Sequence, residues 1–157
     1  MNNNEITFKD KYGNLVVIMI DVVQLFKKYQ QLLPTTPESA GVLIGERRGK
    51  HIVITDISIP GKGDSCSRYQ VDRKGEHHQK KVDESFIRSN KTKHYLGEWH
   101  THPEKQPTPS ALDYKSWSKI HINNENVVLI IVGQHGLWVA TKVQSTFDLL
   151  TEVKHTI

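Results

Sequence analysis

The sequence predicts an α/β domain in which a mixed β-sheet is flanked by helices. Apolar segments of strand length alternate along the chain with segments whose apolar residues recur at helical spacing. Turns rich in glycine, proline and asparagine separate these segments, and the chain has no repeats and no low-complexity tract. The length of 157 residues fits one domain over 1–157, which is long enough to bury a core.

In the first half of the chain, turn residues and Pro34 set the limits of the expected elements. A turn at 11–14 separates two short apolar segments, and Gly49 separates two longer ones. The apolar residues from Val22 to Leu32 recur at the spacing of an amphipathic helix, which Pro34 ends. The expected elements are strands at 5–9, 14–19, 40–45 and 51–59 and a helix at 21–33.

The second half of the chain is expected to alternate helices with strands. Val82, Phe86 and Ile87 lie on one side of a predicted helix, and Ser110 is a predicted N-cap of the next. The turn at 134–136 separates two apolar strands. The expected elements are strands at 68–71, 94–101, 126–132 and 137–143 and helices at 76–89 and 111–121. Residues 147–153 fit a strand or a helix, and a strand is favoured.

Composition and charge favour a cytoplasmic protein and argue against a membrane or nucleic-acid partner. No apolar run approaches the length of about 18 residues that a membrane helix needs, and no secretory signal precedes the domain. The single cysteine, Cys66, excludes an internal disulfide. The net charge is +4, yet acidic residues are interleaved throughout. The most basic region, 68–93, is therefore interpreted as a solvated surface or as a surface for an acidic protein partner.

The clearest functional pattern is His100-Thr101-His102-Pro103 followed, after a proline-rich loop, by Ser110-x-x-Asp113. Residues two apart in a strand share a face, so the two imidazoles are expected to point the same way. Asp113 falls in the first turn of the helix that Ser110 caps, where its carboxylate can turn back toward them. Surface histidines and a capping box would each explain part of this pattern. Together, two imidazoles and one carboxylate predict a zinc site with one open position, as in hydrolases.

These residues resemble the JAMM motif of the JAB/MPN metallopeptidase family. Residues 37–45, Pro-Glu-Ser-Ala-Gly-Val-Leu-Ile-Gly, resemble the upstream part of that motif, and the resemblance covers residues 15–143. It implies that Glu38, rather than Glu46 beside the Gly49 turn, is the catalytic glutamate. The resemblance further implies these site residues: catalytic Glu38 and Ser110, and the zinc (Zn2+) ligands His100, His102 and Asp113.

The family resemblance implies a single JAB/MPN-like domain that hydrolyses amides with zinc. The bond cleaved is usually an isopeptide between a lysine and the C-terminus of ubiquitin or a ubiquitin-like protein. In such a mechanism Glu38 takes a proton from a zinc-activated water and passes it to the leaving amine. The Ser110 hydroxyl and the zinc stabilise the oxyanion.

A narrower resemblance is to a short bacterial branch of the family that occurs in CBASS anti-phage operons. It rests on residues 95–103, on 107–110 and on 113–117, and the predicted helix at 76–89 fits it too. It implies a deubiquitinase-like isopeptidase that releases a cyclic-nucleotide synthase from its conjugates and so opposes an E1/E2-like ligase. An extended C-terminal tail would be held by adding to a sheet edge, with 61–93 and 104–109 flanking the cleft.

Two other interpretations remain open at this stage. The motif also resembles RadC-like JAB proteins linked to DNA metabolism, although that branch usually has Asn where this chain has Thr101. A non-catalytic MPN scaffold is the second, but scaffolds of that type have lost zinc ligands and none is missing here. Glu98 shares the strand face of the histidine pair and is interpreted either as a group just outside the metal ligands or as a salt-bridge partner. His77 and His78 are expected on the surface.

Overall fold

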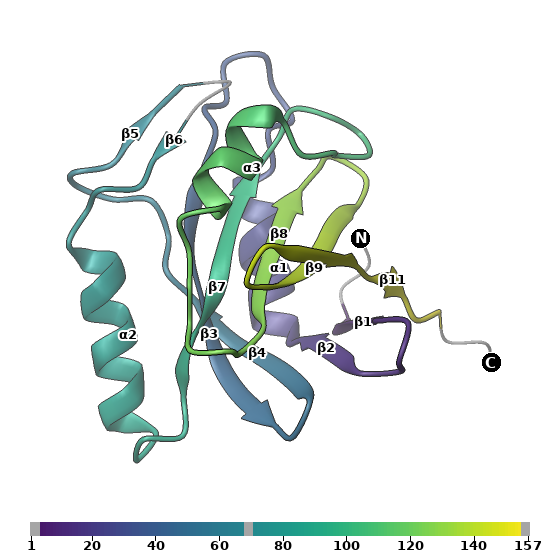
Figure 1. Ribbon diagram of the computed structural model, residues 1–157. Helices are drawn as coiled ribbons and strands as arrows, with labels where there is room; N and C mark the ends of the chain where they lie inside the picture. Colours follow the sequence, from purple (N-terminus) through teal and green to yellow (C-terminus); the bar gives the residue numbers. More distant parts are fainter. Residues whose placement is uncertain (1–3, 68–70, 155–157) are drawn as a thin grey trace.

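The computed structural model describes residues 4–67 and 71–154 and is dominated by one large mixed sheet (Figure 1). Its strands are β1 (Ile6–Lys9), β2 (Leu15–Ile18), β3 (Ala40–Arg48), β4 (His51–Ile57), β7 (His94–Thr101), β8 (Val127–Val132), β9 (Leu137–Val143), β10 (Thr146–Leu149) and β11 (Thr151–Glu152). They are ordered β10-β9-β8-β7-β3-β4-β2-β1-β11. The pairs β2–β4 and β7–β8 are parallel and the other pairs are antiparallel, which confirms the mixed α/β class.

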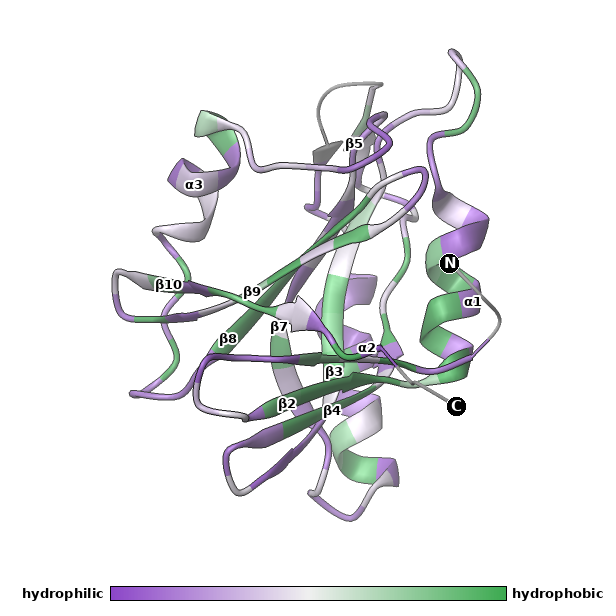
Figure 2. Cartoon of the chain, turned by 90° about the vertical axis from the view of Figure 1, so that its right-hand side faces the viewer, coloured by the Kyte–Doolittle hydropathy of each residue, from purple (hydrophilic) through white to green (hydrophobic). Residues whose placement is uncertain are grey.

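Three helices and a separate hairpin surround this sheet. The helices are α1 (Ile20–Tyr29), α2 (His77–Arg88) and α3 (Ala111–Trp117), and the hairpin pairs β5 (Ser65–Cys66) with β6 (Val71–Asp72). The views in Figures 1 and 2 place α1 and α3 on opposite sides of the sheet. None of the helices among the described residues is long and apolar enough to cross a membrane.

The register of the central strands fixes where the predicted site lies. Strand β7 runs between β3 and β8, so both of its edges are hydrogen-bonded. Its pairing with β3 sets His100 opposite Ala40, and its pairing with β8 sets His100 opposite Ile131. A slip by one residue would turn every side chain of β7 to the other face, so this double pairing strongly specifies which face carries His100.

Apolar side chains form two buried clusters on the two sides of the sheet. The larger cluster includes Phe26 of α1 and Trp99 of β7, whose rings lie 5.3 Å apart. The smaller cluster fastens α3 to the sheet through Trp117, which stacks on Trp138 at 5.5 Å with an angle of 8° between the rings. The hydropathy colouring in Figure 2 shows the apolar strands of the sheet between these helices.

The structure differs from the sequence prediction mainly where elements end. Helix α1 ends at Tyr29 rather than at residue 33, because Leu32 and Leu33 are 59% and 63% exposed and do not extend its apolar face. Helix α3 ends at Trp117 rather than at residue 121. The single strand expected at 147–153 is two strands, β10 and β11, because they pair with different neighbours, β9 and β1.

The segment around the hairpin was also predicted incompletely. Ser65 and Cys66 form β5, where no strand was expected. Of the strand expected at 68–71, residues 68–70 lie outside the described residues, and β6 begins at Val71. Strands of two residues are too short to show an alternation of apolar and polar residues, so hydropathy could not predict this hairpin.

Candidate metal centre

The side chains of His100, His102 and Asp113 converge from β7, the residue after it and α3. His100 Nε2 lies 3.1 Å from His102 Nε2, and each nitrogen lies 3.2 Å from an oxygen of the Asp113 carboxylate. Two imidazole nitrogens and one carboxylate oxygen in this arrangement are a donor set that suits zinc. The residues therefore fit a metal ion with three protein ligands.

A fourth side chain orients one of these imidazoles. Glu104 Oε1 lies 2.9 Å from His102 Nδ1, the ring nitrogen that faces away from Asp113. Such a contact fixes the tautomer and the orientation of a metal-binding imidazole and raises its basicity. The sequence prediction did not assign Glu104, although its position two residues after His102 is a signal that could have suggested it.

Ser110 and Asp113 form a reciprocal capping box at the start of α3. The Ser110 hydroxyl oxygen accepts a hydrogen bond from the Asp113 N–H at 3.1 Å, and Asp113 Oδ2 accepts one from the Ser110 N–H at 2.8 Å. Ser110 was predicted as this N-cap, and the prediction is confirmed. The capping box orients the Asp113 carboxylate toward the histidines, and the Ser110 O–H proton stays available to a third group.

Glu38 lies beside the histidine pair, whereas Glu46 does not. The Glu38 side chain precedes β3 and is only 5% exposed, and one carboxylate oxygen lies within 4.8 Å of a ring nitrogen of each histidine. Glu46 lies near the far end of β3, where Arg48 binds it at 2.6 Å. The backbone N–H of Glu38 donates to the carbonyl of Ser67 at 2.5 Å, which ties this segment to the β5–β6 hairpin.

Burial and neighbouring groups shift the pKa values of the side chains in this cluster in different directions. Burial raises the pKa of Glu38 to about 7, an effect that His102 partly offsets and Asp113 reinforces. Burial also disfavours ionisation of Asp113, but hydrogen bonds from His100 and His102 outweigh it and hold its pKa well below the usual range. For His102, burial is outweighed by hydrogen bonds to Asp113 and Glu104, which raise its pKa to about 9. Carboxyl groups of such different pKa values are typical of functional sites.

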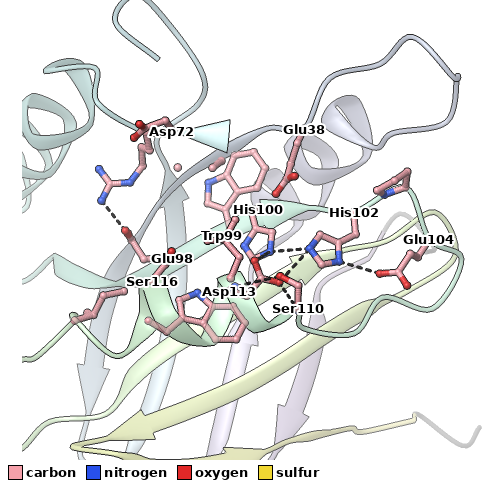
Figure 3. Close-up of a pocket in the computed structure, with 17 residues that line it drawn as sticks. Glu38, Asp72, Glu98, Trp99, His100, His102, Glu104, Ser110, Asp113 and Ser116 are labelled. Carbon is pink, nitrogen blue, oxygen red and sulfur yellow. Dashed lines mark hydrogen bonds and ion pairs between the residues drawn. The ribbon is translucent and has the colours of Figure 1, made fainter. Parts of the chain in front are cut away.

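The cluster opens into a cleft of about 580 Å³ between α3 and the hairpin. Figure 3 shows Glu104 toward one end of this cleft and Glu98 with Asp72 toward the other. Glu98 is ion-paired with Arg73, as the sequence analysis interpreted it. The cleft is lined by Glu38, Ala40, Gly41, Asp72, Arg73, Glu98, Trp99, His100, His102, Pro103, Glu104, Ser110, Leu112, Asp113, Ser116, Trp117 and Ile120.

A second cluster of ligand-type side chains lies at the base of the hairpin, and it corrects the prediction for His78. His78 is fully buried rather than on the surface: its Nε2 lies 2.8 Å from Asp64 Oδ2 and its Nδ1 lies 2.5 Å from Ser58 Oγ. His77 Nε2 bonds the carbonyl oxygen of Ile59 at 2.6 Å. These nitrogens are already engaged in hydrogen bonds, so the cluster fastens the hairpin base to the sheet and needs no ion.

Comparison with protein families finds one match over most of the chain. Residues 28–147 match the model described as prokaryotic homologues of the JAB domain. A solved protein from Desulfitobacterium hafniense superposes with a TM-score of 0.57 at 16% identity, covering 81% of this chain and 83% of that one. This likeness concerns the fold alone.

Two curated relatives match nearly the full length. A CD-NTase/cGAS isopeptidase of Vibrio cholerae is 49% identical over 154 residues, which is 98% of this chain and 99% of the relative. A protein of the same name from Escherichia coli is 48% identical over 150 residues and covers 96% of each chain. Identity of this extent, with the family match, establishes the family of the chain.

Proposed function

Because this chain belongs to the prokaryotic homologues of the JAB domain, we propose that it is a zinc-dependent isopeptidase. Its substrate would be a conjugate between the C-terminus of a CD-NTase, a nucleotide synthase, and a lysine amine. The observation that carries this proposal is the convergence of His100, His102 and Asp113 beside the buried Glu38. The name CD-NTase/cGAS isopeptidase, given to two relatives that match nearly the full length of this chain, supports the same substrate class.

Glu38 would move the proton in this reaction. A zinc ion held by His100, His102 and Asp113 would supply Lewis-acid activation of a water molecule and of the scissile carbonyl. Glu38 would accept a proton from that water molecule and return it to the leaving lysine amine. Burial keeps bulk water away from this carboxyl, which favours transfer to the substrate.

Ser110 would stabilise the oxyanion that forms at the scissile carbonyl. Its oxygen already accepts the Asp113 N–H at 3.1 Å, so its own proton can be donated to a substrate oxygen at no cost to the helix cap. A donor fixed in advance by a helix N-terminus needs no reorganisation during the reaction, which is the property that makes such donors effective. The place of Ser110 in the helix cap beside Asp113 supports this role.

The cleft would hold the C-terminal tail of the conjugated protein in an extended conformation. Its volume of about 580 Å³ lies in the range that ligand sites usually show. The β5–β6 hairpin forms one side of the cleft, and only two strands pair in it, so a tail could add to its edge through main-chain hydrogen bonds. An E1/E2-like ligase that forms the conjugate would be the opposing activity. The nine-stranded sheet pairs β1 from the start of the chain with β11 from its end, which supports one domain over 1–157.

The decisive experiment is cleavage of a purified CD-NTase conjugate, analysed by mass spectrometry. The expected product is the intact synthase, released with a free C-terminal carboxyl. Glu38→Ala should retain zinc and release nothing, whereas Glu46→Ala, a matched change near the far end of β3, should remain active. Release of a truncated synthase would indicate an ordinary endopeptidase, and an active Glu38→Ala variant would overturn the assignment of the base.

A further inference from the structure

An ion pair between Arg73 and Glu98 closes the end of the cleft opposite Glu104 (Figure 3). Arg73 follows β6 and its Nη2 donates to Glu98 Oε1 at 2.5 Å, with 31% and 17% of the two side chains exposed. The Tyr95 hydroxyl also contacts this carboxylate, whose second oxygen, Oε2, is buried and has no hydrogen bond of standard geometry from any residue in 4–67 or 71–154. A carboxylate oxygen without a partner costs free energy, which a bound donor would recover.

The Arg73–Glu98 pair lies where an extended peptide that reaches the metal ligands would pass. Glu98 and His100 are two residues apart on β7 and both line the cleft, so their backbones lie about 7 Å apart at the usual strand rise. An extended tail advances by the same rise for each residue. Its second or third residue before the scissile carbonyl would therefore lie beside Arg73 and Glu98.

The chemistry of an isopeptide offers this pair different partners on the two sides of the scissile bond. On the leaving side, a flexible lysine stem has four methylene groups, and main-chain hydrogen-bonding groups follow only beyond them. On the other side, each tail residue has one N–H donor and one carbonyl acceptor. Arg73 has N–H groups beyond the one that holds Glu98, and Glu98 has one unpartnered oxygen. This donor and acceptor together complement a main-chain amide.

We propose that Arg73 and Glu98 form a subsite for the main chain of the conjugated tail, two or three residues before the scissile bond. This inference rests on the proposed isopeptidase function. The guanidinium and the carboxylate neutralise each other, so the subsite selects for an extended backbone rather than for a charged side chain. Tails that bend or end before this position lose its hydrogen bonds.

The test compares long and short tails on purified, zinc-loaded protein. The probes are a pool of eight-residue peptides joined through their C-terminal carboxyl to the lysine ε-amine, and a matched set with one tail residue. Arg73→Ala should lower kcat/KM for the long tails about tenfold or more, mainly by raising KM, because hydrogen bonds to charged groups are lost. For the one-residue set it should change nothing. Lys74→Ala is the matched control, since Lys74 is the neighbouring exposed cation and does not line the cleft.

A charge-swapped variant separates a subsite from a simple tether of the hairpin. Arg73→Glu combined with Glu98→Arg keeps the ion pair but exchanges donor and acceptor, so it should not recover cleavage of long tails. Full recovery, or equal losses for long and short tails in Arg73→Ala, would overturn the subsite. If the wild-type protein cleaves neither probe set nor a CD-NTase conjugate, the isopeptidase function itself fails. Zinc content and melting temperature, measured on each variant, report whether it is folded.

Discussion

Replacing Glu38 by glutamine should stabilise the metal-free protein at alkaline pH. In the folded chain burial raises the pKa of this carboxyl from 4.5 to about 7. Below pH 4.5 the group is protonated whether the chain is folded or not, and its pKa shift costs no stability. As the pH rises through 7 the unfolded chain ionises more easily than the folded one, so stability is lost.

The size of this effect follows from the two pKa values. The rise from 4.5 to about 7 corresponds to about 3 kcal/mol at pH 8, because each pKa unit is worth about 1.36 kcal/mol. Glutamine has nearly the same shape and carries no charge at any pH, so Glu38→Gln should unfold about 6–12 °C above the wild type at pH 8. At pH 5 the advantage should fall below about 1 kcal/mol.

The assay is thermal unfolding of chelator-treated wild type and variant at pH 5 and pH 8. Glu46→Gln is the control, because Glu46 is ion-paired with Arg48 and its pKa is lowered by that hydrogen bond, so removing its charge should not stabilise the protein. Equal melting temperatures for wild type and Glu38→Gln at pH 8 would refute the claim that Glu38 is held in a desolvated position. Adding zinc should reduce the advantage, since a nearby cation favours the ionised carboxylate.

Three further predictions concern the metal, the helix cap and the central strand. The purified protein should contain about one zinc per chain, and Asp113→Ala should lose it, as measured by elemental analysis; zinc-free protein never exposed to chelator would contradict this. Ser110→Ala should cost about 1 kcal/mol of stability through the lost cap and lower kcat about 100-fold or more, so unchanged turnover would exclude the oxyanion role. Gly97→Ala should destabilise the fold by about 2 kcal/mol or more, because its Cβ would lie 1.8 Å from the Val128 carbonyl oxygen; an unchanged urea midpoint would show that β7 and β8 can separate.

The parts of the site that the sequence predicted depend on short-range geometry. His100 and His102 share a face because they are two residues apart at the end of a strand, and Asp113 faces them because Ser110 caps its helix. Each of these rules acts over a few residues and can be read without knowing the fold. The position of Glu38, by contrast, came only from the family resemblance, because 62 positions separate it from His100.

The parts that could not be predicted depend on contacts between distant segments. Arg73 reaches Glu98 across 25 positions, and His78 is buried because Ser58 and Asp64 bond both of its ring nitrogens. Two adjacent histidines on a polar helix belong to no helical repeat of apolar residues, so nothing in the sequence indicates that one of them is buried. Hydropathy likewise placed Leu32 in α1, although the helix ends at Tyr29 and the Leu32 side chain is 59% exposed.

The capping box at α3 also bears on which ions the protein can accept. Asp113 Oδ2 already receives the Ser110 N–H at 2.8 Å, and Oδ1 lies 3.2 Å from His100 Nε2. A carboxylate shared in this way with a helix N-terminus has little freedom to rotate into bidentate coordination. Calcium and magnesium need six or more oxygen donors, whereas two imidazoles and a single carboxylate oxygen suit a borderline-soft ion. Millimolar calcium or magnesium should therefore neither replace the proposed zinc ion nor compete with it, although both cations are abundant.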